Sequence, residues 1–188
     1  MAKIRLYALC DQAILDERGV SIDEFIEIAK RHNAEIIQYR NKDADISFIK
    51  KQLIHIRKNY NGFLIVNDRY ELVEFCDGVH VGQEDLMKID KDTKKAMSVI
   101  RSVIQEDKIL GLSTHNEEEV LSANEMNVNY IGLGAYRDTR TKKVTDILGE
   151  NLDNIASKSK HLVAAIGGVK MNDRFENITY HVIGSGLL

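Results

Sequence analysis

Eight short runs rich in aliphatic and β-branched residues recur along the chain, and a polar or amphipathic segment follows each of them. Strands that alternate with helices on this scale pair in parallel through right-handed crossovers. Eight such units predict a compact α/β fold, the (β/α)8 TIM barrel. The runs lie at residues 4–10, 34–40, 62–68, 78–82, 108–114, 129–135, 161–168 and 179–186.

Helical periodicity fills several of the connections between these runs. Ser21 with Glu24 three residues later has the pattern of a capping box, and Asn116 precedes a run of glutamates as an N-cap does. Apolar residues at three- and four-residue intervals predict helices over residues 22–31, 46–58, 93–104 and 117–124.

The segments that connect the predicted strands become short toward the carboxyl end of the chain. Residues 169–178 have room for only a short helix, and little sequence follows the eighth run, so short or missing last helices are expected. An open, doubly wound sheet is the structural alternative. The barrel is preferred because polar residues stand at the carboxyl ends of nearly all eight runs. With no linker or low-complexity segment, residues 1–188 are predicted to form a single TIM-barrel domain.

Bulk properties argue against several classes of protein. The formal net charge is −3, so no excess of basic charge indicates a nucleic-acid partner. No apolar run approaches the roughly 18–20 residues that span a bilayer, and the first residues lack a signal-peptide pattern. Cys10 and Cys76 make neither a disulfide framework nor a metal-ligand spacing. The sequence therefore predicts a cytoplasmic protein with no nucleic-acid or membrane partner.

Polar residues gather where the predicted strands end. In a barrel the carboxyl ends of all strands open onto one face, and active sites are built there. Gln38 and Arg40 alternate along one strand and therefore point the same way. The other residues at these ends are Lys42, Asn67, Asp68, Gln83, Glu84, Asp85, Ser113, Thr114, His115, Thr139, Thr141, Lys142, Lys143, Gly167, Gly168, Gly184, Ser185 and Gly186.

These residues supply three kinds of chemistry. Arg40, Lys42 and Lys142 are cations suited to phosphate oxygens, and an arginine can donate two hydrogen bonds at once. Asp68 and Asp85 offer hard oxygen ligands, and Mg²⁺ is commonly held by one or two carboxylates together with substrate phosphates. The glycine-rich ends of the last two runs expose backbone N–H groups that can bind phosphate. Two anion sites with a metal between them predict one substrate with a diphosphate and another with a phosphate.

Each of these residues also fits an ordinary structural role. Charged residues at strand ends are usually solvated, a lone Asp is more often an N-cap than a metal ligand, and a Gly-Gly pair is more often a turn than a phosphate cradle. His80 lies inside a run, where a satisfied core histidine is the default, and Tyr7 and Tyr136 fit packing roles. His115 is as consistent with a position before a helix cap as with catalysis. The functional interpretation depends on the co-occurrence of these residues at one end of the barrel.

Seven motifs occur in a fixed order along the chain. They are QYRNK at 38–42, LIVND at 64–68, GVHVGQED at 78–85, GLSTH at 111–115, YIGLGAYRDTRTKK at 130–143, AIGGV at 165–169 and GS at 184–185. This series resembles the thiamine-phosphate synthase family, and the resemblance covers almost the whole chain. The combination of ND, GVHVGQED and a TxTK loop is specific. The chain departs from the family at residues 135–138, which read AYRD where the family usually has a proline and an aromatic residue.

The resemblance implies a barrel enzyme, a transferase that joins hydroxymethylpyrimidine diphosphate to hydroxyethylthiazole phosphate and gives thiamine phosphate and pyrophosphate. By resemblance the diphosphate leaves first, and the thiazole nitrogen then attacks the pyrimidinyl cation, so no protein nucleophile is needed. Arg40, Lys42 and Lys142 would be catalytic because they stabilise the leaving group, and Asp68 and Asp85 would hold the cofactor Mg²⁺. The implied substrate-binding residues are Gln38, Tyr39, Arg40, Asn41, Lys42, Asn67, Ser113, Thr139, Arg140, Thr141, Lys142, Gly168, Gly184 and Ser185.

Two other functions stand against the synthase. A thiazole tautomerase of the closely similar barrel family would use His115 as its acid–base, but that family generally lacks the lysine and the two aspartates that are present here as Lys42, Asp68 and Asp85. A barrel that binds thiamine-pathway ligands without turnover would serve as a regulator, and the altered loop at 135–138 motivates this hypothesis. The expected partners are phosphorylated pyrimidine and thiazole substrates, and the sequence leaves open whether the chain forms a homodimer.

Overall fold

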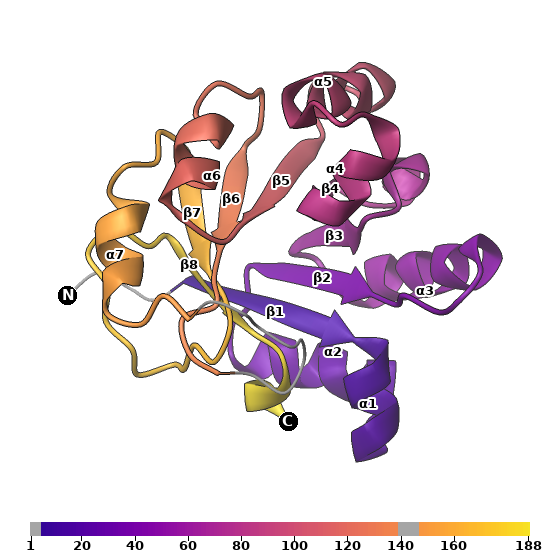
Figure 1. Cartoon of the computed structure of the whole chain (residues 1–188). Coiled ribbons are helices and arrows are strands. Elements are labelled where there is room, and N and C mark those ends of the chain that lie inside the picture. Colours follow the sequence, from indigo (N-terminus) through magenta and orange to yellow (C-terminus); the bar gives the residue numbers. More distant parts are fainter. Residues whose placement is uncertain (1–4, 139–146) are drawn as a thin grey trace.

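Eight parallel strands pair in sequence order and close into a barrel, because β8 pairs with β1 as well as with β7 (Figure 1). The structure is a computed structural model, and it describes residues 5–138 and 147–188. Closure confirms the predicted (β/α)8 barrel, and the alternative of an open sheet is wrong. The strands are β1 (Arg5–Asp11), β2 (Ile36–Arg40), β3 (Phe63–Asn67), β4 (Gly78–Val81), β5 (Ile109–Thr114), β6 (Tyr130–Leu133), β7 (Leu162–Ala165) and β8 (Tyr180–Ile183).

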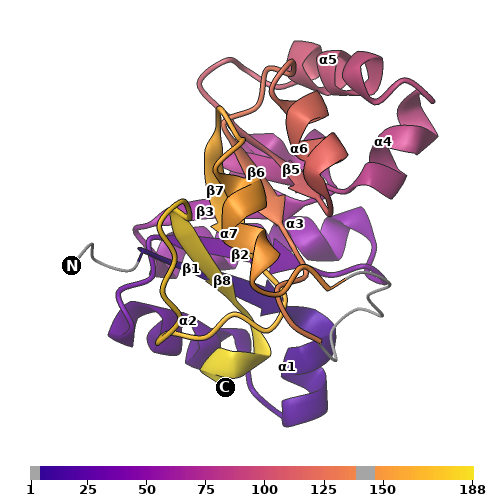
Figure 2. The same cartoon turned by 60° about the vertical axis from the view of Figure 1, so that its left-hand side comes forward.

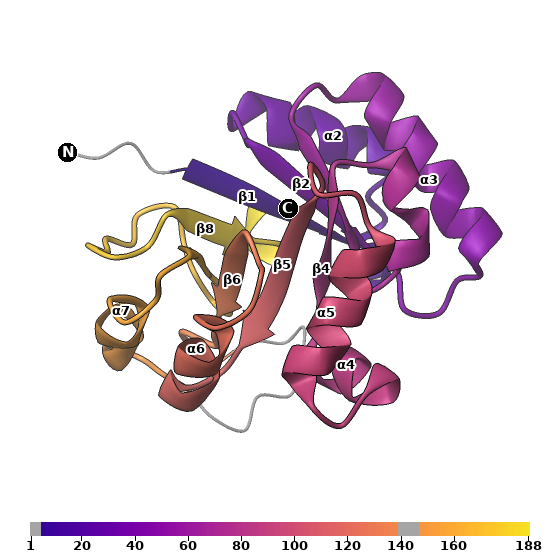
Figure 3. The ribbon, with the colours of Figure 1, turned by 90° about the horizontal axis from the view of Figure 1, so that it is seen from above.

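Helices lie on the outside of the barrel (Figures 1 and 3). The four helices predicted from periodicity are confirmed to within one residue at each end. Within the described ranges, none of the helices combines the length and the apolar composition needed to cross a membrane. The helices are α1 (Gln12–Arg18), α2 (Ile22–Arg31), α3 (Ile46–Asn59), η1 (Tyr70–Phe75), α4 (Gln83–Ile89), α5 (Thr93–Val103), α6 (Glu117–Ala123), α7 (Asn151–Ala156) and η2 (Ser185–Leu187), where η1 and η2 are 3₁₀ helices.

Two helices begin at the caps that the sequence predicts. Ser21 Oγ accepts a hydrogen bond from Glu24 N at 3.2 Å, and Ser21 N donates to Glu24 Oε2 at 2.8 Å, which completes the capping box of α2. Asn116 Oδ1 accepts from Glu119 N at 2.9 Å at the start of α6. These bonds satisfy N–H groups that have no partner inside a helix. Local sequence therefore decides where both helices begin.

The last connections are short, as predicted. Helix α7 has 6 residues. Residues 166–179, which join β7 to β8, form turns and bends without a helix, and they cross the outside of the barrel as a loop (Figure 2). Less helix therefore covers β7 and β8 than covers the first five strands.

Alternate residues of each strand face two separate cores. Outward side chains such as Ile37 and Leu64 pack with the helices in one large cluster. Inward side chains such as Ile36, Ile65 and Tyr130 fill the barrel. Because side chains alternate along a strand, the parity of a position decides whether its residue can reach the interior of the barrel.

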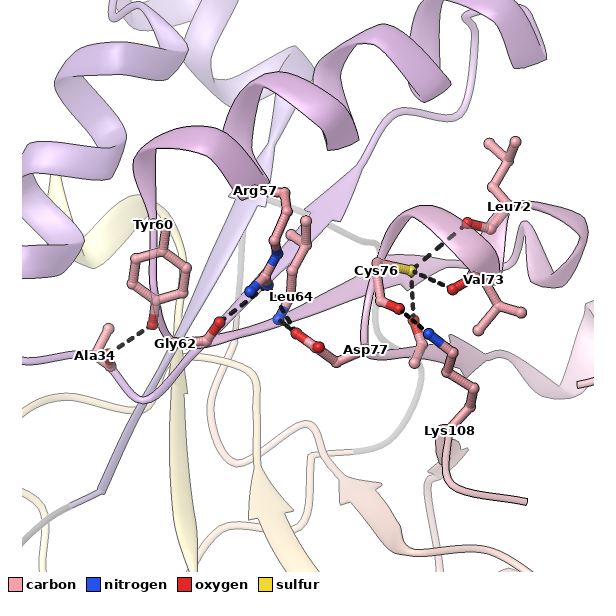
Figure 4. Close-up of polar contacts among 11 residues, drawn as sticks. Ala34, Arg57, Tyr60, Gly62, Leu64, Leu72, Val73, Cys76, Asp77 and Lys108 are labelled. Atoms are coloured by element: carbon pink, nitrogen blue, oxygen red, sulfur yellow. Dashed lines mark hydrogen bonds and ion pairs between the residues drawn. The ribbon is translucent and has the colours of Figure 1, made fainter. Parts of the chain in front are cut away.

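Polar contacts join the amino ends of three strands (Figure 4). Asp77, just before β4, accepts hydrogen bonds from Arg57 Nη2 and from Leu64 N of β3, both at 2.7 Å. Lys108, just before β5, donates from Nζ to Cys76 O at 2.7 Å. These contacts hold β3, β4 and β5 together at the end of the barrel opposite the polar strand ends. In TIM barrels this amino face serves stability, whereas the carboxyl face serves chemistry.

The Asp77 contacts predict a clear effect on stability. Asp77→Ala leaves the buried Leu64 N–H without its acceptor and Arg57 without its carboxylate, so we expect the free energy of unfolding to fall by about 1–3 kcal/mol. Urea unfolding followed by circular dichroism measures the change. Asp23→Ala is the matched control, because Asp23 pairs with His55 on the surface and its side chain is 70% exposed. Equal stability of the two variants would contradict the assigned role of Asp77.

Candidate active site

Two carboxylates converge on Gly82 at the carboxyl ends of β3 and β4. Asp68 follows β3 directly, and Asp85 lies in the first turn of α4. A Cβ placed on Gly82 would lie 3.4 Å from Asp85 Oδ2 and 4.0 Å from Asp68 Oδ1, so both side chains reach the same small space. Gly82 N also donates to Asp68 Oδ1 at 3.2 Å. The structure therefore brings together the two aspartates that the sequence proposes as metal ligands.

The backbone of Asp68 holds its carboxylate toward this space. Asp68 has a φ of 61°, a left-handed conformation that short polar residues such as Asp tolerate better than most. Its backbone N–H donates to His80 O at 2.8 Å, and Asn67 Nδ2 donates to Asp68 Oδ2. These bonds tie the turn after β3 to β4, so the side chain of Asp68 is fixed by its neighbours on both strands.

The electrostatics of this pair suit a divalent cation. Burial and the negative charge of Asp85 raise the pKa of Asp68, while the Gly82 N–H and the positive charge of Lys42 oppose that rise. Two carboxylates that repel each other and offer hard oxygens fit Mg²⁺. No group of three or more His, Cys, Asp or Glu side chains among the described residues, here or at another place, could hold a metal, so this pair supplies only two protein ligands. Mg²⁺ would thus take its remaining ligands from water and substrate phosphates.

Arg40 is held at the mouth of the barrel by Asp11, a residue that the sequence-based prediction omitted. Asp11 ends β1, lies opposite Arg40 in the strand register, and forms an ion pair with its guanidinium. Asp11 is 3% exposed, and its Oδ1 also accepts from Ala13 N at 3.1 Å at the start of α1. The sequence feature that could have identified Asp11 as a site residue is its position directly after the first predicted strand. Because a guanidinium carries five N–H donors, Arg40 can bind Asp11 and phosphate oxygens together.

The other residues of the QYRNK motif take different directions. Tyr39 is buried in the outer core, and its hydroxyl donates to Gln12 Oε1 at 2.9 Å, so its side chain points away from the barrel interior. Asn41 Oδ1 accepts from Ala44 N at 3.1 Å and shapes the turn after β2. Lys42 is exposed on this turn. The charge of Lys42 acts on Asp68, whereas the side chain of Tyr39 lies on the outer side of the strand.

Gln38, Asn67 and Ser113 lie at the same end of the barrel and contact residues that the sequence had assigned to the core. Gln38 Nε2 donates to Asn67 Oδ1 at 2.7 Å, and Gln38 Oε1 accepts from the Tyr7 hydroxyl at 2.9 Å. Ser113 Oγ lies 2.9 Å from His80 Nε2. Burial lowers the pKa of His80 to about 4, so this ring is neutral near pH 7. Tyr7 and His80 are therefore hydrogen-bond partners of predicted site residues.

The loops after β6 and β7 are joined by Arg137, which lies in the segment that departs from the family pattern. Arg137 donates from Nη1 to Gly168 O at 2.9 Å, and its two terminal nitrogens each lie 2.7 Å from an oxygen of Asp173. Gly168 has a φ of +67°, which favours glycine. Gly184 and Ser185 follow β8, and Gly184 lies beside Leu9 of β1.

Four predicted site residues lie outside the described residues. Their predicted roles in binding phosphate stay predictions, and so does the catalytic role of the lysine among them. The four are Thr139, Arg140, Thr141 and Lys142.

Comparisons with known proteins identify the family that this chain resembles. The family described as thiamine monophosphate synthase matches residues 6–184. A thiamine-phosphate synthase of Lawsonia intracellularis is 36% identical over 185 residues, which cover 93% of this chain and 79% of that protein. One from Caldanaerobacter subterraneus subsp. tengcongensis is 32% identical over 181 residues, with 93% and 79% covered.

A solved structure shares the fold. Thiamine phosphate pyrophosphorylase from Pyrococcus furiosus superposes with a TM-score of 0.72 at 24% identity, and the match covers 89% of this chain and 76% of that one. The family match spans nearly all eight strands, and the two relatives exceed 30% identity over most of their length. On these grounds the chain belongs to the thiamine monophosphate synthase family.

Proposed function

We propose that this chain joins hydroxymethylpyrimidine diphosphate to hydroxyethylthiazole phosphate and releases pyrophosphate, with Mg²⁺ as cofactor. The observation that carries the proposal is the convergence of Asp68 and Asp85 on Gly82, at the end of the barrel where Asp11 holds Arg40. A metal-binding carboxylate pair beside a fixed guanidinium suits a diphosphate. The identity of the reaction is inferred from membership in the family.

The first step is departure of the diphosphate. The bond between the pyrimidine methylene carbon and the diphosphate oxygen breaks, and the electron pair leaves with the oxygen. Arg40, Lys42 and Lys142 donate hydrogen bonds to the negative charge that grows on the leaving group. Mg²⁺, when held by Asp68 and Asp85, would neutralise part of the same charge. The nitrogen lone pair of the thiazole then forms the new carbon–nitrogen bond, so no protein nucleophile is required.

The remaining residues hold the two substrates in place. In this proposal Gln38, Asn67 and Ser113 contact the pyrimidine diphosphate from inside the barrel mouth, while Tyr39 and Asn41 support the turn that carries Lys42. Holding both reactants in a reactive geometry lowers the barrier in addition to the electrostatic stabilisation. The thiazole phosphate is assigned to Gly168, Gly184 and Ser185 together with Thr139, Arg140 and Thr141.

One observation keeps the tautomerase alternative open to test. His115 lies at the end of β5, and its Nδ1 is 3.0 Å from Glu119 Oε2, an arrangement in which a carboxylate orients an imidazole. The same bond also fits a structural role at the start of α6. The synthase is favoured because Asp68, Asp85 and Lys42 would have no part in an isomerisation by His115.

The proposed function is tested by incubating the purified chain with both thiamine precursors, with and without Mg²⁺, and measuring thiamine phosphate and pyrophosphate. We expect equal amounts of the two products, formed only with Mg²⁺. Absence of both products at any Mg²⁺ concentration would contradict the synthase. In that case calorimetry with each precursor separates a binding protein from a tautomerase, which would instead interconvert thiazole carboxylate isomers.

Substitution of Asp85 tests the metal site. Asp85→Asn keeps the shape of the side chain but removes its charge, so we expect kcat/KM to fall about 100-fold, the usual cost of losing one preorganised group. The Mg²⁺ concentration for half-maximal rate should rise. Glu84→Gln is the matched control, since Glu84 is the exposed neighbour of Asp85 in α4. If Asp85→Asn and Glu84→Gln gave the same rates, Asp85 would not be a ligand.

Substitution of Arg137 tests the proposed thiazole phosphate site. Arg137→Ala removes the bonds that join the loop after β6 to Gly168 and Asp173, so we expect KM for the thiazole phosphate to rise about tenfold. The KM for the pyrimidine diphosphate should stay within about twofold, because Asp68 and Arg40 are unaffected. The matched control is Arg174→Ala, since Arg174 is an exposed arginine next to Asp173. Equal changes in both KM values would contradict the assignment.

A further inference from the structure

A continuous series of hydrogen bonds crosses the barrel interior from Ser113 to Asp68. From Ser113 Oγ the distances are 2.9 Å to His80 Nε2, 3.0 Å from His80 Nδ1 to the Tyr130 hydroxyl, and 2.8 Å from there to the Tyr7 hydroxyl. The Tyr7 hydroxyl lies 2.9 Å from Gln38 Oε1, and Gln38 Nε2 lies 2.7 Å from Asn67 Oδ1. Asn67 Nδ2 completes the series at Asp68 Oδ2. The members are Ser113, His80, Tyr130, Tyr7, Gln38, Asn67 and Asp68, and we call them the interior relay.

The donors and acceptors of the relay can run in one direction only. The carboxylate of Asp68 accepts, so Asn67 presents its N–H₂ group to it and its oxygen to Gln38. Gln38 must then present its own oxygen to Tyr7, which makes the Tyr7 hydroxyl a donor. A hydroxyl has one proton, so Tyr7 accepts from Tyr130.

The same assignment of donors and acceptors extends to His80 and Ser113 at the other end of the relay. The Tyr130 hydroxyl donates to Tyr7, so it accepts from His80 Nδ1, which must carry a proton. Within the described residues the two ring nitrogens of His80 lie against the Tyr130 and Ser113 hydroxyls and not against a carboxylate, and a charged ring without a counter-charge is costly inside a barrel. The ring is therefore assigned as neutral, so its Nε2 has no proton and accepts from the Ser113 hydroxyl. The single proton of Ser113 is thus committed to His80, and the lone pairs of Ser113 Oγ remain for another partner.

Packing holds the rings of the relay in place. The rings of His80 and Tyr130 stack with centroids 5.5 Å apart and planes 28° apart. A Cβ on Gly132 would lie 3.0 Å from His80 Cε1, and one on Gly111 would overlap the ring of Tyr130. The two glycines leave the space that these rings occupy, so alternative positions of the rings are sterically restricted.

We propose that His80, Tyr130 and Tyr7 are positioning residues which hold Ser113 as a hydrogen-bond acceptor toward the substrate. The substrate group that Ser113 selects is then a donor, such as an amino group or a ring N–H of a heteroaromatic compound. This consequence for the substrate rests on the proposed function, whereas the direction of the relay rests on the structure alone. None of the three residues is required to exchange protons with the substrate.

The test is the tautomer of His80 in the ¹⁵N-labelled full chain, measured by long-range ¹H–¹⁵N correlation spectra. The His80 signals are identified by their loss in His80→Gln. We expect a protonated Nδ1 and an unprotonated Nε2 in the wild-type chain. Tyr130→Phe removes the acceptor for Nδ1–H and should move Nε2 toward the protonated form. A wild-type ring with its proton on Nε2, or with protons on both nitrogens, would overturn the proposal. This result does not depend on whether the variants fold.

A matched pair of variants supplies the kinetic readout. Tyr130→Phe should lower kcat/KM for the pyrimidine diphosphate about tenfold, the scale of one hydrogen bond, and leave KM for the thiazole phosphate unchanged. Tyr180→Phe is the control, because Tyr180 also lies inside the barrel but its hydroxyl binds Arg5 outside the relay. Equal losses in the two variants would overturn the positioning role. A wild-type chain with the expected tautomer but no synthase activity would refute the proposed function and leave the relay intact.

Discussion

Pairing between β1 and β8 is the constraint on which the site depends. The register places Arg5 opposite Tyr180 and Ala8 opposite Ile183, so the first and last strands of the chain become neighbours. Only then do Gly184 and Asp11 open onto the same face as Asp68 and Asp85. Parallel strands in a closed sheet present all their carboxyl ends together. A chemical site can thus be assembled from residues that are far apart in sequence.

Closure of the barrel also creates an interior that side chains must fill. Near the carboxyl ends of the strands, this interior contains polar side chains. Tyr7, Ile65 and Tyr130 fill its depth, and glycines at 111 and 132 make room for large rings. Buried polar groups are costly unless they are hydrogen-bonded. The interior relay satisfies each of its members and so permits a polar interior beneath the proposed metal site. The same bonds that satisfy the interior also orient the residues proposed to face the substrate.

The barrel fold and many of the residues at its strand ends could be predicted from the sequence. The alternation of strands with helices, and the polar residues that follow each strand, are both visible in short segments of the chain. Asp68 and Asp85 each follow a strand by a few residues, and parallel pairing was enough to place them together. Asp11 obeys the same rule at the end of β1, so a consistent use of the rule would have included it. The inward positions of Gln38 and Arg40 likewise imply that Tyr39 points outward.

Other features of the site could not be predicted because they depend on contacts between different strands or loops. His80 contacts Ser113 only because of the register between β4 and β5, which pairs His80 with Gly111. Helices α1 and α4 begin directly at the polar ends of β1 and β4, so their first turns resemble strand ends, whereas α6 has the same length but was marked by its Asn116 cap and run of glutamates. The altered loop did not reveal that Arg137 would bind Gly168 and Asp173, since that contact joins two separate connections.

The central claim is that Asp68 and Asp85 bind one divalent cation together with a diphosphate. Anomalous diffraction from crystals grown with Mn²⁺ and pyrophosphate measures this directly, because Mn²⁺ accepts the same oxygen ligands as Mg²⁺. We predict one anomalous peak within bonding distance of both carboxylates and of the pyrophosphate, with Arg40 in contact with the same pyrophosphate. A pyrophosphate bound near Arg40 with no peak between the two aspartates, or with a peak elsewhere, would contradict the account.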